Sequence, residues 1–351
     1  MKKAFLVLIT IALVVGLSLS GIIPVAAQEP PDEGKVYTEV TLPLSTETVA
    51  DVHTIPRGSV IYHFDDGTTE IYGPNNEFIL AARDSEAALI PAPGGPARAT
   101  YVYQIPNGSR IDTEGDTTYV YEGETCILTV VNQSEASITK GSRTLPPPPP
   151  NYTGWIECSR DESVAAIDWF RAYWAVPSSP PQHGSTTVDY LFNGIVKSTV
   201  IIQPVLEYNF HYDGEWTGAA WYVWDGWYRS AEVSVSTGNT IRGTTSWGTT
   251  YAGYWDIEFK NTSTGISTHC HTNKISTDLN LKIYCALEGV RVYKDGDVPG
   301  DTTFYSMTFK HDGSTVDITW DDYVWPEAEE ILTGLGVVIY SDIKVKLETA
   351  N

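Results

Sequence analysis

Between residues 166 and 346 the sequence repeats one pattern, in which short runs rich in Val, Ile, Thr, Tyr and Trp alternate with turn residues. β-Branched and aromatic side chains favour the pleated surface of a strand, and turn residues at this spacing favour antiparallel connections. Strands are expected at Ala166–Ala175, Thr187–Phe192, Thr199–Tyr208, Ala219–Trp224, Ala231–Val235, Thr240–Ser246, Tyr254–Lys260, Ile283–Tyr293, Phe304–Lys310, Thr315–Trp320 and Val337–Lys346. One helical turn is expected at Trp325–Leu332. The pattern predicts an all-β fold whose C-terminal part is an antiparallel β-sandwich of the concanavalin or jelly-roll kind.

A run of five prolines, at residues 146–150, divides the chain. Consecutive prolines form a stiff, extended spacer. We therefore expect a small β-rich N-terminal module at 30–145, a linker at 146–150 and the sandwich at 151–351.

The N-terminal module contains an internal sequence repeat. Ile55–Ser59 returns as Ile105–Ser109, and Thr68–Tyr72 returns as Thr117–Tyr121. Each copy reads as strands joined by Asp-Gly or Asn-Gly turns, which predicts two short β-meanders that pair or stack, with a loop at 91–97 between them. A propeptide, a wall-binding module and a spacer are all compatible with this module; for a propeptide, the cut is expected in the proline run.

The first 27 residues have the form of a signal peptide: two lysines, an apolar stretch and a small-residue site before Gln28. A retained anchor is the alternative. The formal net charge of −22 argues against nucleic acid as a partner, because phosphate binding needs clustered Lys and Arg. We expect a secreted monomer without a cofactor or metal. Sequons at Asn107, Asn132, Asn151 and Asn261 are candidate glycan sites.

The cysteine count is even, which in an exported chain favours disulfides. Cys270 and Cys285 flank a turn-like segment and are the expected pair, and Cys126 with Cys158 would then span the linker. Free thiols, or a zinc site that uses His269 and His271, are the alternatives.

Two polar side chains interrupt apolar strands. Gln203 lies in a Val/Ile-rich run, where an amide without a hydrogen bond costs roughly 1–3 kcal/mol. Glu288 lies in a second apolar run, where burial would raise the pKa of a carboxyl. Gln203 can be a structural amide with satisfied hydrogen bonds. Alternatively, Gln203 and Glu288 together could activate a water and stabilise an oxyanion. No Gly-x-Ser-x-Gly or His-Glu-x-x-His motif is present.

Several aromatic residues cluster between positions 216 and 228. Tryptophan buries a large area in any core, so this cluster fits core packing. It equally fits a groove floor that stacks on a peptide or on sugar rings.

The order of these segments resembles the glutamic peptidases of the eqolisin type and, more distantly, the neprosin-like peptidases, over residues 166–310. The similar segments are Phe170–Pro177, Asn193–Ile195 followed by Thr199–Gln203, Ala220–Trp224, Ser236–Ile241, Trp255–Gly265 and Ala286–Val290. The resemblance implies a β-sandwich with a concave groove and an acid-acting endopeptidase made with a propeptide. It assigns Gln203 and Glu288 as the catalytic dyad, with Trp221, Tyr222 and Trp224 lining the groove for a protein or peptide substrate.

The chain departs from the family pattern at Pro204, at Gly289 and at Asn193. Pro204 removes a backbone donor next to Gln203, and Gly289 stands where the family tends to have Trp. The alternatives to a peptidase are a non-catalytic β-sandwich that binds glycans or the cell envelope, and a structural component of the envelope.

Overall fold

The computed structural model describes residues 35–39, 51–85, 87, 89–133, 151–164, 166–277 and 281–351. The expected signal peptide and the proline run lie outside these residues. The described chain is nearly all β, which confirms the all-β prediction. No helix in the described ranges is long and apolar enough to cross a membrane.

One mixed sheet, here called sheet A, has 11 strands. In spatial order it contains β2 (Asp51–Thr54), β1 (Lys35–Glu39), β8 (Val102–Ile105), β17 (Trp227–Ser230), β16 (Trp216–Val223), β15 (Val200–Tyr208), β14 (Val188–Lys197), β22 (Leu281–Val292), β12 (Tyr152–Val164) and β25 (Asp321–Val324), with β18 (Val233–Ser234) beside β16.

The second mixed sheet, sheet B, has 14 strands. In spatial order it contains β26 (Gly336–Ser341), β27 (Lys344–Glu348), β23 (Thr302–His311), β13 (Trp169–Ala175), β19 (Thr240–Trp247), β20 (Trp255–Asn261), β21 (Ser267–Thr272), β9 (Ser109–Glu114), β10 (Thr117–Glu122), β11 (Thr125–Asn132), β3 (Ser59–His63), β4 (Thr68–Tyr72) and β5 (Phe78–Arg83), with β24 (Ser314–Thr315) beside β23.

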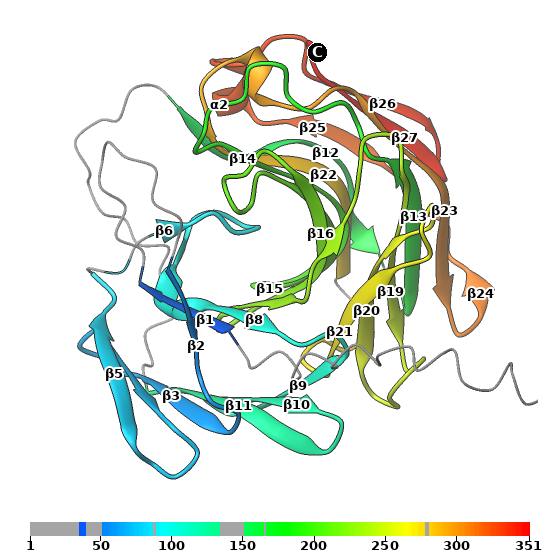
Figure 1. The fold of residues 1–351 in the computed structure, drawn as a ribbon. Helices are drawn as coiled ribbons and strands as arrows, with labels where there is room; N and C mark the ends of the chain where they lie inside the picture. Colours follow the sequence, from blue (N-terminus) through cyan, green and yellow to red (C-terminus); the bar gives the residue numbers. More distant parts are fainter. Residues whose placement is uncertain are drawn as a thin grey trace, which may run out of the picture. The chain divides into compact units, whose positions relative to one another are not determined.

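The remaining elements are short. They are the hairpin strands β6 (Leu89–Ile90) and β7 (Ala97–Arg98), the 3-10 turns η1 (Ala99–Tyr101) and η2 (Asp295–Asp297), and the helical turn α2 (Pro326–Glu329). Figure 1 shows how these elements lie about the two sheets.

A continuous apolar core joins the facing sides of the two sheets. Strand alternation sends every second residue of β15, such as Ile202 and Leu206, into this core. On sheet B, Trp174 meets Phe259 edge to face and lies 5.2 Å from Phe304, measured between ring centroids. Burial of the apolar side chains of this core, these large rings among them, stabilises the sandwich.

The predicted meanders are present as β3–β4–β5 and β9–β10–β11, and they pair in parallel through β11 and β3. They also extend the sandwich, because β9 pairs with β21 in sheet B. In sheet A, β8 pairs with β17. Residues 34–351 accordingly form one compact unit. Strands from the two sides of the proline run share both sheets, and every described strand pair within 152–351 is antiparallel.

The second face of sheet A carries a separate apolar cluster. It includes Tyr190, Phe192, Val205 and Trp221 from the sheet, and Ile90, Ala92 and Ala97 from the segment that contains the β6–β7 hairpin. In Figure 1 strands β14, β16, β15 and β8 curve around β6. The N-terminal region therefore covers the concave face of sheet A with a loop, residues 91–97.

The predicted disulfides do not form, and all four cysteines are free thiols. Cys270 is on β21 of sheet B and Cys285 is on β22 of sheet A, so the turn-like segment between them crosses from one sheet to the other. Burial raises the pKa of both thiols. Because the thiolate is the reactive form, this burial protects them from oxidation.

The four sequons differ in access. Asn107 is exposed, whereas the side chain of Asn261 is buried and its Nδ2 donates to Asn239 Oδ1 at 2.8 Å. The Asn261 amide is therefore not accessible for glycosylation in the folded chain.

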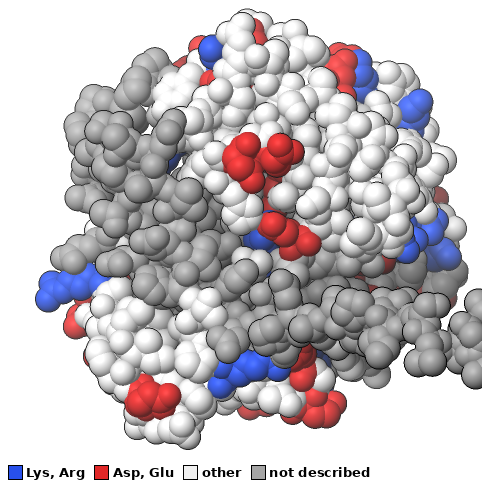
Figure 2. Space-filling view, viewed as in Figure 1, with Lys and Arg blue, Asp and Glu red and all other residues white. Residues whose placement is uncertain are grey.

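Charged groups are dispersed on the visible surface. Figure 2 shows small groups of acidic and basic side chains separated by uncharged atoms on the described part of this face. Arginine and lysine form no extended patch there, in keeping with the formal net charge of −22.

Candidate active site

Strands β15, β14 and β22 are neighbours in sheet A and place Gln203 and Glu288 on one face. Glu288 on β22 lies opposite Tyr190 on β14, and Tyr190 lies opposite Glu207 on β15. Gln203 is on the same side of β15 as Glu207, because side chains two residues apart point the same way. The face they share carries the apolar cluster of Tyr190, Val205 and Trp221. The structure thus brings the two predicted residues to the concave face that the 91–97 loop covers.

Glu288 is fully buried and binds the backbone of this loop. The N–H of Gly94 donates to both carboxylate oxygens, at 3.0 Å each. The carbonyl oxygen of Pro93 accepts a hydrogen bond from Trp227 Nε1, also at 3.0 Å. Two side chains of sheet A therefore hold the peptide group that joins Pro93 to Gly94.

Gln203 is fully buried, and neither its Nε2 nor its Oε1 has a hydrogen-bond partner among the described residues. Gly194 on β14 lies beside it; a Cβ at that position would come within 3.2 Å of Gln203 Cβ and 3.5 Å of Oε1. An unpaired buried amide costs roughly 1–3 kcal/mol. Its place on the face of Glu288 is consistent with a group that binds water or substrate.

The same loop lies against the strand of Gln203. A Cβ on Gly94 would lie 3.7 Å from Ile201 Cδ1. Ile201 is two residues from Gln203 on β15 and shares its face. The loop that binds Glu288 therefore also contacts the neighbourhood of Gln203.

The three departures from the family pattern lie on the side of sheet A that faces the core between the sheets. A Cβ on Gly289 would lie 2.4 Å from Val292 Cγ2 and 3.0 Å from Ile156 Cδ1, so a side chain does not fit there. Pro204 points to the opposite face of sheet A, where its Cγ would lie 2.7 Å from a Cβ on Gly243 of sheet B. Asn193 points to that face too, so neither Pro204 nor Asn193 faces Glu288.

Of the predicted groove residues, only Trp221 belongs to the cluster on this face. Tyr222 is its neighbour in β16 and points into the core between the sheets, where its ring stacks on Tyr228 at 5.5 Å. Trp224 also packs against that core and carries Lys274 Nζ 3.4 Å above its ring. The structure therefore does not bring Tyr222 or Trp224 to Glu288, because alternation sends adjacent residues to opposite faces.

A buried ion pair lies beside Tyr190. Arg229 donates to Glu207 through Nε at 3.0 Å and through Nη2 at 2.6 Å, and both side chains are fully buried. Trp221 Nε1 donates to the same carboxylate at 2.6 Å. This bidentate geometry fixes the indole of Trp221 on the concave face.

Tyr190 is influenced by both carboxylates. Burial, and then the charges of Glu207 and Glu288, raise the pKa of its hydroxyl, which keeps the group protonated. Its hydroxyl has no hydrogen-bond partner among the described residues. The face that carries Glu288 therefore also carries two unpaired polar groups, from Tyr190 and Gln203. Tyr190 lies directly opposite Glu288, whereas Gln203 lies four positions along β15 from Glu207, the residue opposite Tyr190.

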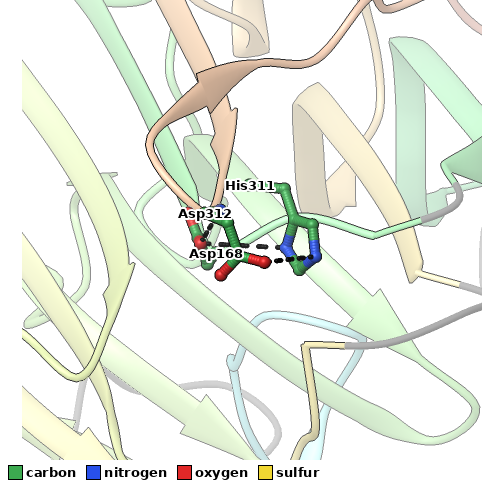
Figure 3. A group of neighbouring side chains, drawn as sticks. All are labelled: Asp168, His311 and Asp312. Carbon is green, nitrogen blue, oxygen red and sulfur yellow. Dashed lines mark hydrogen bonds and ion pairs between the residues drawn. The ribbon is translucent and has the colours of Figure 1, made fainter.

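Another group of potential metal ligands lies on sheet B. Asp168, His311 and Asp312 bring one ligand atom each within 4.8 Å of one another (Figure 3). Exposed acidic groups of this kind are common without an ion. His311 ends β23, Asp312 lies in the turn after it and Asp168 precedes β13, so the group is on sheet B and away from the face of Glu288.

Sequence reasoning missed three parts of this site. The 91–97 loop was expected to be only a connection, and no local signal links Gly94 to a residue 194 positions away. Trp227 belonged to an aromatic cluster without an assigned role. Glu207 is one of many glutamates in the sequence, and no sequence pattern distinguishes it from the others.

No protein-family model and no curated protein matches this sequence. Among solved structures, scytalido-glutamic peptidase with a transition state analog inhibitor is similar at a TM-score of 0.41 and 16% identity, over 57% of this chain and 100% of that chain. An eqolisin-family peptidase, SCP-B, in a complex with the tripeptide Ala-Ile-His is similar at a TM-score of 0.40 and 16% identity, over 57% of this chain and 100% of that chain. Aspergilloglutamic peptidase from Aspergillus niger is similar at a TM-score of 0.31 and 20% identity, over 46% of this chain and 99% of that chain. A TM-score below 0.5 does not establish a common fold, so the function below is argued from the residues of this chain.

Proposed function

We propose that the chain is a secreted, acid-acting endopeptidase of the glutamic type, in which Glu288 is the general base and Gln203 supports the oxyanion. The observation that carries this proposal is the contact of the buried Glu288 carboxylate with the Gly94 peptide group. A carboxylate that binds a backbone amide is placed to exchange protons at a peptide bond.

In the proposed reaction Glu288 removes a proton from water, and the water oxygen bonds to the carbonyl carbon of the substrate. The Gln203 amide, which has no partner among the described residues, donates to the oxyanion. Glu288 then gives its proton to the leaving amine as the C–N bond breaks. Acid favours the last step, because the amine leaves as a protonated group.

The described chain is a latent form in this proposal. The 91–97 loop covers Glu288, and the strands around it are part of both sheets. We propose that activation requires this loop to leave the concave face, as removal of residues 30–145 would achieve.

The test is incubation of the purified chain with denatured casein at about pH 4, near the ordinary pKa of a glutamate. The proposal predicts fragments that a chelator does not suppress. If neither the full-length chain nor full-length Gly94→Ala, in which the loop is strained, yields fragments, the proposal fails. A glycan- or envelope-binding role would then be the explanation to examine with soluble glycan arrays.

A further inference from the structure

The peptide group between Pro93 and Gly94 is held at both of its polar atoms. Its N–H donates to the Glu288 carboxylate and its oxygen accepts from Trp227 Nε1. This peptide bond is trans, as are the others among the described residues, so its N–H and C=O point to opposite edges of the planar group. Glu288 and Trp227 therefore lie at opposite edges of one peptide bond.

The backbone conformation of the loop lets its peptide group come close to Glu288 and Trp227. Gly94 has a φ of 87° and Gly95 a φ of 113°, values that side-chain-bearing residues rarely adopt. On either side, Ile90 and Ala97 anchor the β6–β7 hairpin in the apolar cluster of sheet A. Trp227 begins β17, which is paired with β16 on one side and with β8 on the other.

We infer that this peptide group marks where the scissile bond of a substrate lies, and that the indole N–H of Trp227 is a catalytic donor to its carbonyl oxygen. The inference rests on the proposed peptidase function and deepens it. Water oxygen would bond to the carbonyl carbon, while the carbonyl oxygen gains negative charge facing Trp227. Collapse breaks the C–N bond, and Glu288 returns the proton of the water to the nitrogen.

The same geometry explains why the loop inhibits. The Gly94 N–H engages both oxygens of Glu288, so the carboxylate that should bind and activate water is bonded to the amide instead. The loop is therefore a substrate-like ligand in a non-productive state. A substrate must leave one carboxylate oxygen accessible to water.

The test compares wild type with Trp227→Phe on denatured casein at about pH 4, the pH near the ordinary pKa of glutamate. Loss of one oxyanion donor predicts a kcat lower by about 10²–10³-fold, with KM little changed. The matched control is Trp247→Phe, a partly buried tryptophan on β19 of sheet B that lies outside the site. It is expected to retain the wild-type rate.

A second variant removes the N–H without changing shape. Incorporating β-(3-benzothienyl)alanine at position 227 replaces the indole nitrogen with sulfur, so it keeps the packing even where the phenylalanine variant fails to fold. The inference predicts the same loss of kcat. If wild type cleaves casein and the benzothienyl variant cleaves it equally fast, the role of Trp227 is refuted while the peptidase function stands. If neither full-length wild type nor full-length Gly94→Ala, in which the loop is strained, cleaves casein, the peptidase function itself fails.

Discussion

The backbone N–H of Gly94 donates to both carboxylate oxygens of Glu288, at 3.0 Å each, although the two residues are 194 positions apart. The contact joins the N-terminal region to the face of sheet A on which Gln203 lies. It places a peptide backbone at the candidate general base and so suggests both the substrate and the means of inhibition.

Weakening the loop should increase activity. Ala at position 94 would be strained by about 1 kcal/mol or more at a φ of 87°, while its Cβ would make only an ordinary contact. A shift of this size favours the open loop by about 5-fold. Full-length Gly94→Ala should therefore cleave casein about 5-fold faster than the wild type, measured as initial rates.

The control for this experiment is Gly67→Ala. Gly67 has a φ of 76° in the turn between β3 and β4, and a Cβ added there would have no atom within 4 Å, so the substitution imposes the same strain away from Glu288. Equal activation by both variants would show that general loosening, not release of the loop, raises the rate.

Replacing the Gln203 amide with an apolar side chain should raise the stability of the chain and lower its activity. Gln203→Met keeps the length of the side chain and removes two buried polar atoms that have no partner among the described residues. We expect the free energy of unfolding to rise by about 1 kcal/mol or more, and casein cleavage to fall at least about 10-fold. Urea melts and initial rates measure the two effects.

Asn261→Leu is the control, because it removes a buried amide that does have hydrogen-bond partners. The buried Asn261 amide donates to Asn239 Oδ1 at 2.8 Å and accepts from the Ser263 N–H at 3.0 Å, so removing it should lower the free energy of unfolding. A Gln203→Met chain that is destabilised as much as Asn261→Leu would show that Gln203 is a satisfied structural amide.

Stability should fall as the pH rises through the neutral range. Burial raises the pKa of Glu157 to about 9, with the Gly336 N–H as its hydrogen-bond donor at 2.9 Å. Between the ordinary value near 4.5 and about 9 the folded chain holds a proton that the unfolded chain has lost. The free energy of unfolding therefore decreases with pH in this window, by up to about 1.4 kcal/mol per pH unit for this group.

Glu157→Gln tests this effect, because the neutral amide can still accept from Gly336. Its Tm should change less than that of the wild type between about pH 5 and about pH 8. Glu330→Gln, at an exposed glutamate, should melt with the pH dependence of the wild type. An unchanged pH dependence in Glu157→Gln would exclude Glu157 as a source of acid stability.

All four cysteines should react as thiols. In denaturant without a reductant, a colorimetric thiol reagent should detect four thiols per chain, because Cys270 and Cys285 belong to different sheets and no disulfide forms. Detection of two or none would indicate disulfides and contradict the arrangement of these strands.

Much of the fold could be predicted because strand alternation is local. The ranges around Gln203 and Glu288 were expected to be strands, and they are the central strands β15 and β22. By contrast, β12 was not predicted. Its sequence contains charged residues such as Glu157 and Asp161, which are buried through tertiary contacts and hide the apolar pattern of a buried strand. The expected strand Val337–Lys346 is a hairpin of β26 and β27, whose turn lies between Ser341 and Lys344 at the Ser-Asp pair that interrupts the apolar residues.

The site could be predicted only in part. Polar residues in apolar strands identified Gln203 and Glu288, and alternation then explains their common face. The same alternation excludes Tyr222, which sequence proximity to Trp221 had suggested. Gly94 contacts Glu288, and Trp227 contacts Pro93, only because the folded chain brings together residues that are more than 100 positions apart. Local sequence patterns carry no information about such contacts.

The most direct test of the account is the casein assay at about pH 4, run in parallel on full-length wild type and on full-length Glu288→Gln. The amide is nearly isosteric with the carboxylate but cannot take a proton from water, so cleavage should fall by at least about 10²-fold while the thermal melt stays within a few degrees of the wild type. Cleavage by Glu288→Gln at the wild-type rate would contradict the account.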